Sequence, residues 1–224
     1  MWKKQYIDKD KDTISNGWSE LGSLAHNILE SFYKREIKGK EMEKKWQDGH
    51  MELDLRFPSP YMIGPYINGI SLYFLKMGGK FPEYYNGSYK IIGVEREINI
   101  ELAEGVNMIG YIDLELMDKE KNAVIVDHKI SKVFEGSKLE EKLRQLYLYS
   151  LSHNRPPKSL MYNFFWKGEV LEVPFTEEGQ QEALKWALST IKAIEKEKKY
   201  KAAPDKFFCK NLCSFGHTCE FAKK

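Results

Sequence analysis

The stretch "GYIDLELMDKEKNAVIVDHK" (residues 110–129) constrains the fold more than any other part of the sequence. Two apolar segments flank the polar "DKEKN", which is the pattern of a β-hairpin. Charges nevertheless interrupt the strands, with Asp113 in the first and Asp127 and Lys129 in the second. Both aspartates lie seven residues from the turn centre at Glu120. Antiparallel pairing therefore sets the two carboxylates opposite each other, with Cβ atoms roughly 5 Å apart.

These charges predict a phosphodiester-hydrolysing metal site. Lys129 lies two residues beyond Asp127, so both side chains leave the same face of the strand. Two close carboxylates repel unless a cation such as Mg²⁺ or Mn²⁺ lies between them, and such an ion activates water while a lysine neutralises phosphate charge. The alternative is an ion pair on a solvated sheet face. The apolar "AVIV" before Asp127 and "GYI" before Asp113 favour buried strands, where charges need a partner.

The first helix is expected in residues 19–36, with Ser19 as its N-cap. Its buried stripe consists of Leu21, Leu24, Ile28 and Phe32. At 100° per residue, His26 falls on a flank of this stripe together with Glu30. His26 is therefore expected at the edge of the core, facing a cleft.

The remaining pattern predicts an α/β (α+β) fold with a central mixed sheet flanked by helices. Residues 40–90 read as two helices separated by turn-rich breaks, which form a helical cap. A strand is expected in 89–102, then the hairpin, a helix in 138–152, a strand pair in 158–175 and a long helix in 176–199 capped by Thr176. Residues 1–224 are expected to form one domain with a cysteine-bearing tail in 204–224.

Composition narrows the setting but not the partner. The 224 residues are 42% hydrophobic and 30% charged, which suits a folded globular protein. The net charge of +2 leaves room for a local basic groove that binds nucleic acid. No apolar stretch of about eighteen residues occurs, and "MWKKQYIDKDKD" lacks the apolar core of a secretory signal, so we expect a cytoplasmic protein without a membrane partner.

Four short pieces occur in a meaningful order: "GSLAH" (22–26), "GYID" (110–113), "VDHK" (126–129) and "QLYLY" (145–149). Together they resemble the PD-(D/E)XK nuclease superfamily, and within it the RecB-type nucleases that include CRISPR-adaptation nucleases and phage exonucleases. The resemblance spans about residues 19 to 221. It implies a restriction-endonuclease-like core and hydrolysis of DNA.

The resemblance also implies roles for individual residues. His26, Asp113 and Asp127 would hold the metal with their side chains, and His128 would do so with its backbone carbonyl. Lys129 would be the catalytic lysine. Taken alone, His26 is better read as a satisfied histidine at the core edge.

Three further positions carry weaker expectations. Gln145 and Tyr149 share one helix face, and the resemblance implies that they position catalytic groups or DNA. The alternative is an ordinary amphipathic helix in which Tyr149 is core. Glu95 matches an acid often found on the preceding strand of such nucleases, although surface pairing with Arg96 or a lysine is equally compatible with the sequence.

The tail "FFCKNLCSFGHTC" contains all three cysteines of the chain. Related nucleases carry a four-cysteine iron–sulfur cluster, but no cysteine precedes Cys209 here. Cys209, Cys213, His217 and Cys219 would instead complete a tetrahedral Zn²⁺ site. A degenerate tail whose thiols are simply buried is the third alternative.

We therefore expect a deoxyribonuclease that uses Mg²⁺ or Mn²⁺, and more narrowly an exonuclease of phage or bacterial DNA recombination and repair. Its partner would be DNA, as single strands or duplex ends, and a homo-oligomer or a recombination partner protein is compatible with this role. The competing hypothesis is an inactive nuclease fold that binds DNA or docks a partner. A metal-dependent hydrolase of small phosphate esters is the third candidate.

Overall fold

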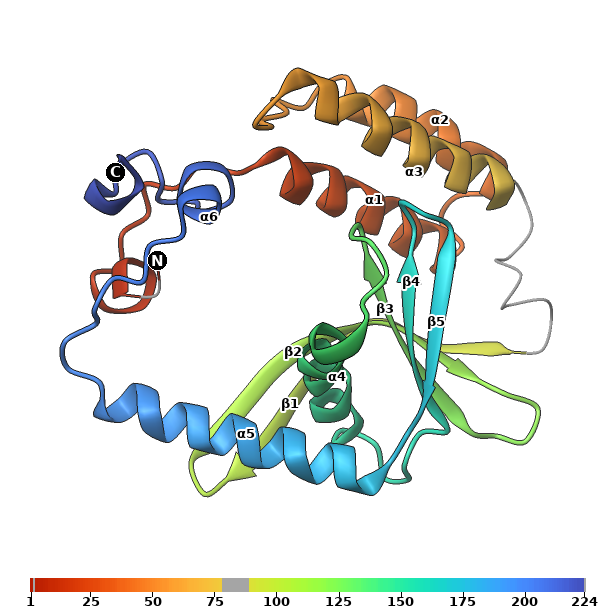
Figure 1. The fold of residues 1–224 in the computed structure, drawn as a ribbon. Helices are drawn as coiled ribbons and strands as arrows, with labels where there is room; N and C mark the ends of the chain where they lie inside the picture. The colour runs from red at the N-terminus through yellow and green to blue at the C-terminus, as the bar shows by residue number, and fades with distance from the viewer. Residues whose placement is uncertain (2, 78–88, 224) are drawn as a thin grey trace.

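The computed structural model describes residues 1, 3–77 and 89–223 and has a five-stranded sheet at its centre (Figure 1). The strands lie in chain order: β1 (Lys90–Ala103), β2 (Val106–Met117), β3 (Ala123–Lys129), β4 (Ser159–Phe164) and β5 (Glu169–Pro174). β3 and β4 run parallel, and every other neighbouring pair is antiparallel. The predicted mixed sheet is therefore confirmed.

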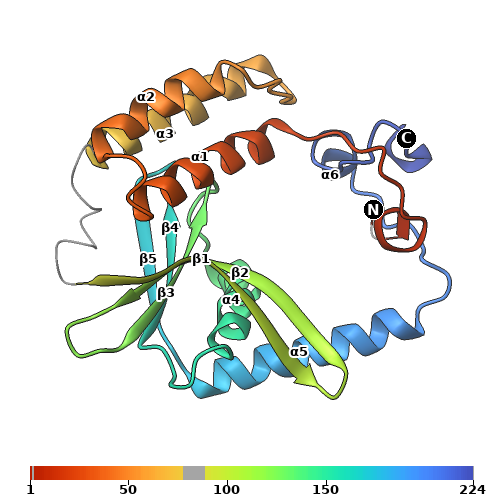
Figure 2. The same ribbon diagram turned by 180° about the vertical axis from the view of Figure 1, so that it is seen from behind.

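Helices cover both faces of this sheet. On one face lie α1 (Gly17–Tyr33), α2 (Gly39–His50) and α3 (Ile63–Met77), and on the other lie α4 (Gly136–Ser150) and α5 (Glu177–Lys196) (Figures 1 and 2). The short elements are η1 (Lys3–Ile7), η2 (Pro60–Met62), α6 (Lys206–Asn211) and η4 (Glu220–Lys223). α2 and α3 confirm the two helices expected in the cap, while the turn-rich part at 78–88 lies outside the described residues.

The central strand β3 explains the continuous apolar run before Asp127. Val124 and Val126 are fully buried against the core beneath α1 to α3, whereas Ile125 is fully buried against α4 and α5. A strand covered on both faces needs apolar side chains at successive positions rather than at alternate ones. Asp127 follows in the same buried strand and is 2% exposed, so its charge lies inside the protein.

The hairpin register also agrees with the prediction. The Asp118 carboxylate accepts backbone hydrogen bonds from Glu120 and Asn122, at 2.9 and 2.8 Å, and thereby closes the turn. From this turn, β2 and β3 pair as far as Leu114 opposite Val126. One step beyond that pair, the same register sets Asp113 opposite Asp127.

Helix α1 begins earlier than expected, and the predicted cap at Ser19 is wrong. The Asn16 side chain is the N-cap and accepts a 3.0 Å hydrogen bond from the backbone N–H of Ser19. With Asn16 as the cap, the helix begins at Gly17, where the Phe57 ring leaves no room for a Cβ and thus reserves the position for glycine. Leu21, Ile28 and Phe32 are buried as predicted, together with Ala25 and Leu29, whereas Leu24 is only partly buried.

We expect Asn16→Ala to lower the free energy of unfolding by about 1 kcal/mol, because it removes the side-chain acceptor at the helix start. Urea titration followed by circular dichroism would measure this loss. The matched control is Ser19→Ala, which keeps the capping bond to its backbone N–H and should change stability by less than about 0.5 kcal/mol. Equal losses in both variants would contradict the assignment of Asn16 as the cap.

The tail packs against the segment that precedes α1, so both chain ends lie side by side (Figures 1 and 2). The backbone N–H of Ile14 donates to the Ser214 carbonyl at 2.9 Å, and the Asn16 amide donates to the Leu212 carbonyl at 3.4 Å. Phe215 is 1% exposed and lies under the Lys4 ammonium.

In the part of the chain that the structure describes, no helix has the length and apolar character that crossing a membrane requires.

Candidate active site

Three potential metal ligands converge where α1, β1 and β2 meet. His26, Glu95 and Asp113 each offer one ligand atom, and these atoms lie within 4.8 Å of one another. They form the one such group of His, Cys, Asp or Glu side chains found in residues 1, 3–77 and 89–223. Imidazole and carboxylate donors suit first-row divalent metals, so the group fits an ion of the predicted kind.

The ring of His26 is oriented by the backbone of β3. Its Nε2 lies 2.9 Å from the His128 carbonyl oxygen, which can only accept, so Nε2 carries the proton. In the neutral ring Nδ1 therefore carries the lone pair, and it faces the Asp113 Oδ2 at 3.6 Å. That separation is too long for a strong hydrogen bond, whereas two ligands of one ion are roughly 3 to 4 Å apart. The predicted location of His26 at the core edge, facing Asp113, is what the structure shows.

Asp113 is positioned by the same peptide segment. Its Oδ2 accepts a 2.7 Å hydrogen bond from the backbone N–H of His128. His128 therefore connects to Asp113 through its N–H and to His26 through its carbonyl. The carbonyl that was predicted as a metal ligand faces the imidazole of His26 in this structure.

Glu95 is the residue that sequence reasoning left without a role. The register of β1 and β2 places Val94 opposite Leu114 and Arg96 opposite Ile112, which puts Glu95 across from Asp113. Glu95 has a φ of 48°, a left-handed backbone conformation that side-chain-bearing residues rarely adopt. Burial, followed by the nearby Asp113 carboxylate, raises the pKa of Glu95 to about 7. This crowding of negative charge is relieved by a bound cation.

The suggested pairing of Glu95 with Arg96 is wrong, because Arg96 reaches Glu115 instead. Counting along the sequence would not have found the position of Glu95. β1 and β2 are joined at Glu104 and Gly105, and equal counting from that turn would set Arg96 opposite Asp113. An irregularity in the pairing between Glu101 and Ala103 shifts the register by one residue and brings Glu95 there instead.

Asp127 and Lys129 form an ion pair rather than joining the group of three ligands. The Lys129 Nζ lies 2.5 Å from the Asp127 Oδ2, with side-chain exposures of 28% and 3%. Burial raises the pKa of Asp127 to about 7, the Lys129 ammonium opposes this rise, and Asp113 adds to it. The structure thus brings His26 and Asp113 together as predicted, but the third member of the group is Glu95 and not Asp127.

The ring of His128 is buried on the face of β3 that α1 covers, whereas the side chains of Asp127 and Lys129 leave the other face. Its Nδ1 accepts a 3.0 Å hydrogen bond from the Asn163 amide, and its ring stacks on Tyr33 with centroids 5.7 Å apart. Burial lowers the pKa of His128, so the ring is neutral and can accept this bond. These contacts hold the peptide segment between Asp127 and Lys129 in place.

Gln145 and Tyr149 make the contact expected of residues one helical turn apart. The Gln145 amide donates a 2.7 Å hydrogen bond to the Tyr149 hydroxyl. Tyr149 is also 9% exposed and packs over Gly110, where a Cβ would lie 2.9 Å from its ring. Tyr149 is therefore a core residue and a neighbour of the site at the same time. Burial raises its pKa, and the charges of Asp127 and Asp113 raise it further.

A buried ion pair that the sequence did not reveal braces the strands that carry Glu95 and Asp113. The Arg96 guanidinium donates to both oxygens of Glu115, at 2.5 and 2.8 Å, and also to the Ser152 hydroxyl at 2.8 Å. His153 approaches the same carboxylate at 2.7 Å. Gly93 leaves the necessary room, because a Cβ there would lie 2.2 Å from the Glu115 carboxylate.

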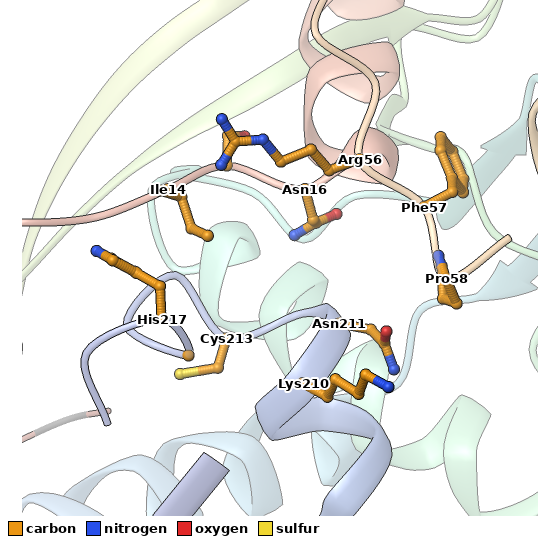
Figure 3. A pocket seen from close by; sticks show the side chains of 11 residues that line it. Ile14, Asn16, Arg56, Phe57, Pro58, Lys210, Asn211, Cys213 and His217 are labelled. Atoms are coloured by element: carbon orange, nitrogen blue, oxygen red, sulfur yellow. The ribbon is translucent and has the colours of Figure 1, made fainter. Parts of the chain in front are cut away.

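The cysteines of the tail do not come together with His217. Cys209, Cys213 and Cys219 are free thiols of intermediate burial. The His217 Nε2 lies 3.0 Å from the Asp12 Oδ1, while Cys213 and His217 both line a pocket beside the start of α1 (Figure 3). In the described part of the chain these four side chains do not form a metal-binding group. The zinc or iron–sulfur site at the tail stays a prediction.

Comparison with known families agrees with the geometry. The family model of the PD-(D/E)XK nuclease superfamily matches residues 2–220. The chain belongs to this superfamily. It is accordingly a nuclease of restriction-endonuclease-like fold, of a kind that uses divalent metals.

Two further comparisons add less. A solved structure described as "Crystal structure of SSO0001" is similar at 16% sequence identity and a TM-score of 0.38, over 97% of this chain and 91% of that chain. The comparison with curated proteins finds no match.

Proposed function

We propose that this protein is a divalent-metal-dependent deoxyribonuclease of the RecB type, and more narrowly an exonuclease of phage or bacterial DNA recombination and repair. The observation that carries the proposal is the group of His26, Glu95 and Asp113 within 4.8 Å, next to the Asp127–Lys129 pair. Superfamily membership supports the reaction class. The order of the four sequence pieces supports the RecB type.

Mg²⁺ or Mn²⁺ would be held by His26, Glu95 and Asp113. When bound, the ion supplies Lewis-acid activation of water and of the phosphodiester. Asp127 lies opposite Asp113 in the strand register and is the fourth candidate ligand, as the sequence predicts. The His128 carbonyl oxygen is the fifth candidate. It could bind the ion if it also keeps, or if it loses, its hydrogen bond from His26.

The side chains of the site have separable tasks. The His128 carbonyl keeps the proton of His26 on Nε2, which leaves Nδ1 free to bind a cation. Lys129 is 28% exposed, and its ammonium can neutralise charge that develops on a phosphate. The Gln145 amide orients the Tyr149 hydroxyl beside the carboxylates.

We also propose that residues 1–224 act as one nuclease domain, since the tail packs on the segment before α1.

The decisive experiment offers labelled single-stranded, blunt duplex and circular DNA to the protein with Mg²⁺, Mn²⁺ or EDTA. We expect linear DNA to shorten progressively with either metal, and EDTA to stop the reaction. Asp113→Asn serves as the inactive control, because it keeps the side-chain shape but loses the charge that holds the metal.

Other outcomes would replace the proposal in defined ways. Cleavage of circular DNA would identify an endonuclease. DNA binding without cleavage under any metal would support the non-catalytic module. Hydrolysis of nitrophenyl phosphate without cleavage of DNA would support a hydrolase of small phosphate esters.

A further inference from the structure

A second concave site lies between α4, α5 and β2, beside the Gln145–Tyr149 pair. Its volume is about 260 Å³. The walls are formed by Met108, Glu141, Lys142, Arg144, Gln145, Leu148, Tyr149 and Trp186. Pockets for drug-sized ligands span roughly 300 to 1,000 Å³, so this cavity takes a smaller, flat group.

The chemistry of the walls combines an aromatic face with a cation. Trp186 is 41% exposed although it is one of the largest apolar side chains. The Arg144 guanidinium lies over its ring at 4.9 Å from the centroid. Among the described residues, no carboxylate forms an ion pair with Arg144. Glu141, which also lines the cavity, pairs with Lys142 at 3.1 Å, and the charges of Lys142 and, to a smaller extent, Arg144 lower the pKa of its carboxyl. The guanidinium is therefore available to an anion.

The cavity and the candidate active site share one residue. Tyr149 lines the cavity and also lies close enough to Asp113 and Asp127 for their charges to act on its hydroxyl. A ligand in the cavity would therefore contact a side chain that borders these carboxylates. Stacking on aromatic side chains together with cationic contacts to phosphate is the usual way in which proteins hold single-stranded nucleic acid.

We propose that this cavity receives one unpaired nucleobase of a single-stranded DNA end, with the base against the Arg144–Trp186 pair and the adjoining phosphate on the Arg144 guanidinium. The inference rests on the proposed nuclease function and narrows its substrate to single strands. A base inside a duplex is stacked between its neighbours and cannot enter without leaving the helix. A strand end with free bases enters without that cost.

The test measures binding of a labelled oligothymidylate in EDTA, so that cleavage does not interfere. One nucleotide at a time is replaced by an abasic residue. With the unmodified protein, an abasic residue at the position that meets the cavity should weaken binding about tenfold. With Trp186→Leu, the intact oligonucleotide should bind about tenfold more weakly, and the abasic residue at that position should cost less than about twofold, because the stacking partner is already absent.

Two variants serve as controls. Trp186→Phe keeps an aromatic face and should retain most of the affinity. Tyr61→Leu removes an aromatic side chain that is 92% exposed on η2, and it should leave binding unchanged. Circular dichroism of each variant verifies folding. Arg144→Gln tests the phosphate contact separately, because loss of the cation should reduce the salt dependence of binding.

The proposal is overturned if Trp186→Leu binds the oligonucleotide as the unmodified protein does, or if every abasic position behaves alike in both proteins. Equal weakening for single strands and for blunt duplex would also overturn it, since a duplex offers no free base. These measurements need neither metal nor turnover. Failure of the nuclease function would appear separately, as absent cleavage with intact, Trp186-dependent binding.

Discussion

Replacement of Lys129 by methionine is expected to reduce DNA cleavage by about 10³-fold while the protein still binds its metal. Methionine keeps much of the apolar stem of lysine but removes the ammonium that lies 2.5 Å from Asp127. That ammonium is the group placed to neutralise charge on the phosphate, and losing such a contact costs on the order of 10² to 10³ in rate. Lys129 cannot itself be a metal ligand while it is protonated.

Single-turnover cleavage of a labelled strand in Mg²⁺, combined with calorimetric titration of Mn²⁺, separates the two effects. Lys129→Met should titrate with Mn²⁺ nearly as the unmodified protein does, whereas Asp113→Asn should lose the titration. Lys132→Met is the matched control, because Lys132 is exposed three residues along the chain and should cleave normally. Full activity of Lys129→Met would remove Lys129 from the mechanism and weaken the superfamily-based assignment of its role.

The facing aspartates were predictable because they depend on counting. An antiparallel hairpin pairs residues at equal distances from its turn, and the Asp118 turn is where the polar "DKEKN" indicates it. The same counting fails for Glu95, because the irregularity between Glu101 and Ala103 shifts the pairing of β1 and β2 by one residue. Backbone register is thus recoverable from hydrophobic pattern and turn length only where no bulge interrupts the pairing.

Side-chain direction was not predictable in the same way. Asp127 turns to Lys129, so the second carboxylate beside His26 belongs to Glu95, whose φ of 48° departs from ordinary strand geometry. The helix cap shows the same limit. Asn16 and Ser19 are both good capping residues, and the choice between them depends on tertiary contacts of the segment with Phe57 and the tail.

Contacts between residues far apart in the chain are even less apparent from the sequence. Arg96 and Glu115 read as ordinary charges on strands, and only the three-dimensional structure shows Glu115 at 3% exposure with Arg96 and His153 around it. The tail illustrates the opposite case, since cysteine spacing indicates metal ligands that the side-chain arrangement does not assemble. Local patterns therefore predict elements and register, whereas buried networks require the packed fold.

Arg96→Met is expected to destabilise the protein by about 3 kcal/mol, because it leaves the buried Glu115 carboxylate without its main partner. The expected loss is at the lower end for buried pairs, since the Arg96 side chain is 37% exposed and His153 remains beside Glu115. The double variant Arg96→Met, Glu115→Met removes both charges and should recover most of the stability. Urea unfolding at pH 7 would measure all three proteins.

The same pair should show a defined dependence on pH. Burial alone would raise the pKa of Glu115, but hydrogen bonds from Arg96 and then His153 outweigh it and hold that pKa at about 2. The unfolded chain has a glutamate pKa of about 4.3, so the stabilisation is complete above about pH 5 and is lost as the pH falls towards 2. The difference in unfolding free energy between the unmodified protein and Arg96→Met should accordingly shrink from pH 5 to pH 3. A difference that stays constant over this range would mean that Arg96 stabilises the fold by packing of its aliphatic stem and not through the charge of Glu115.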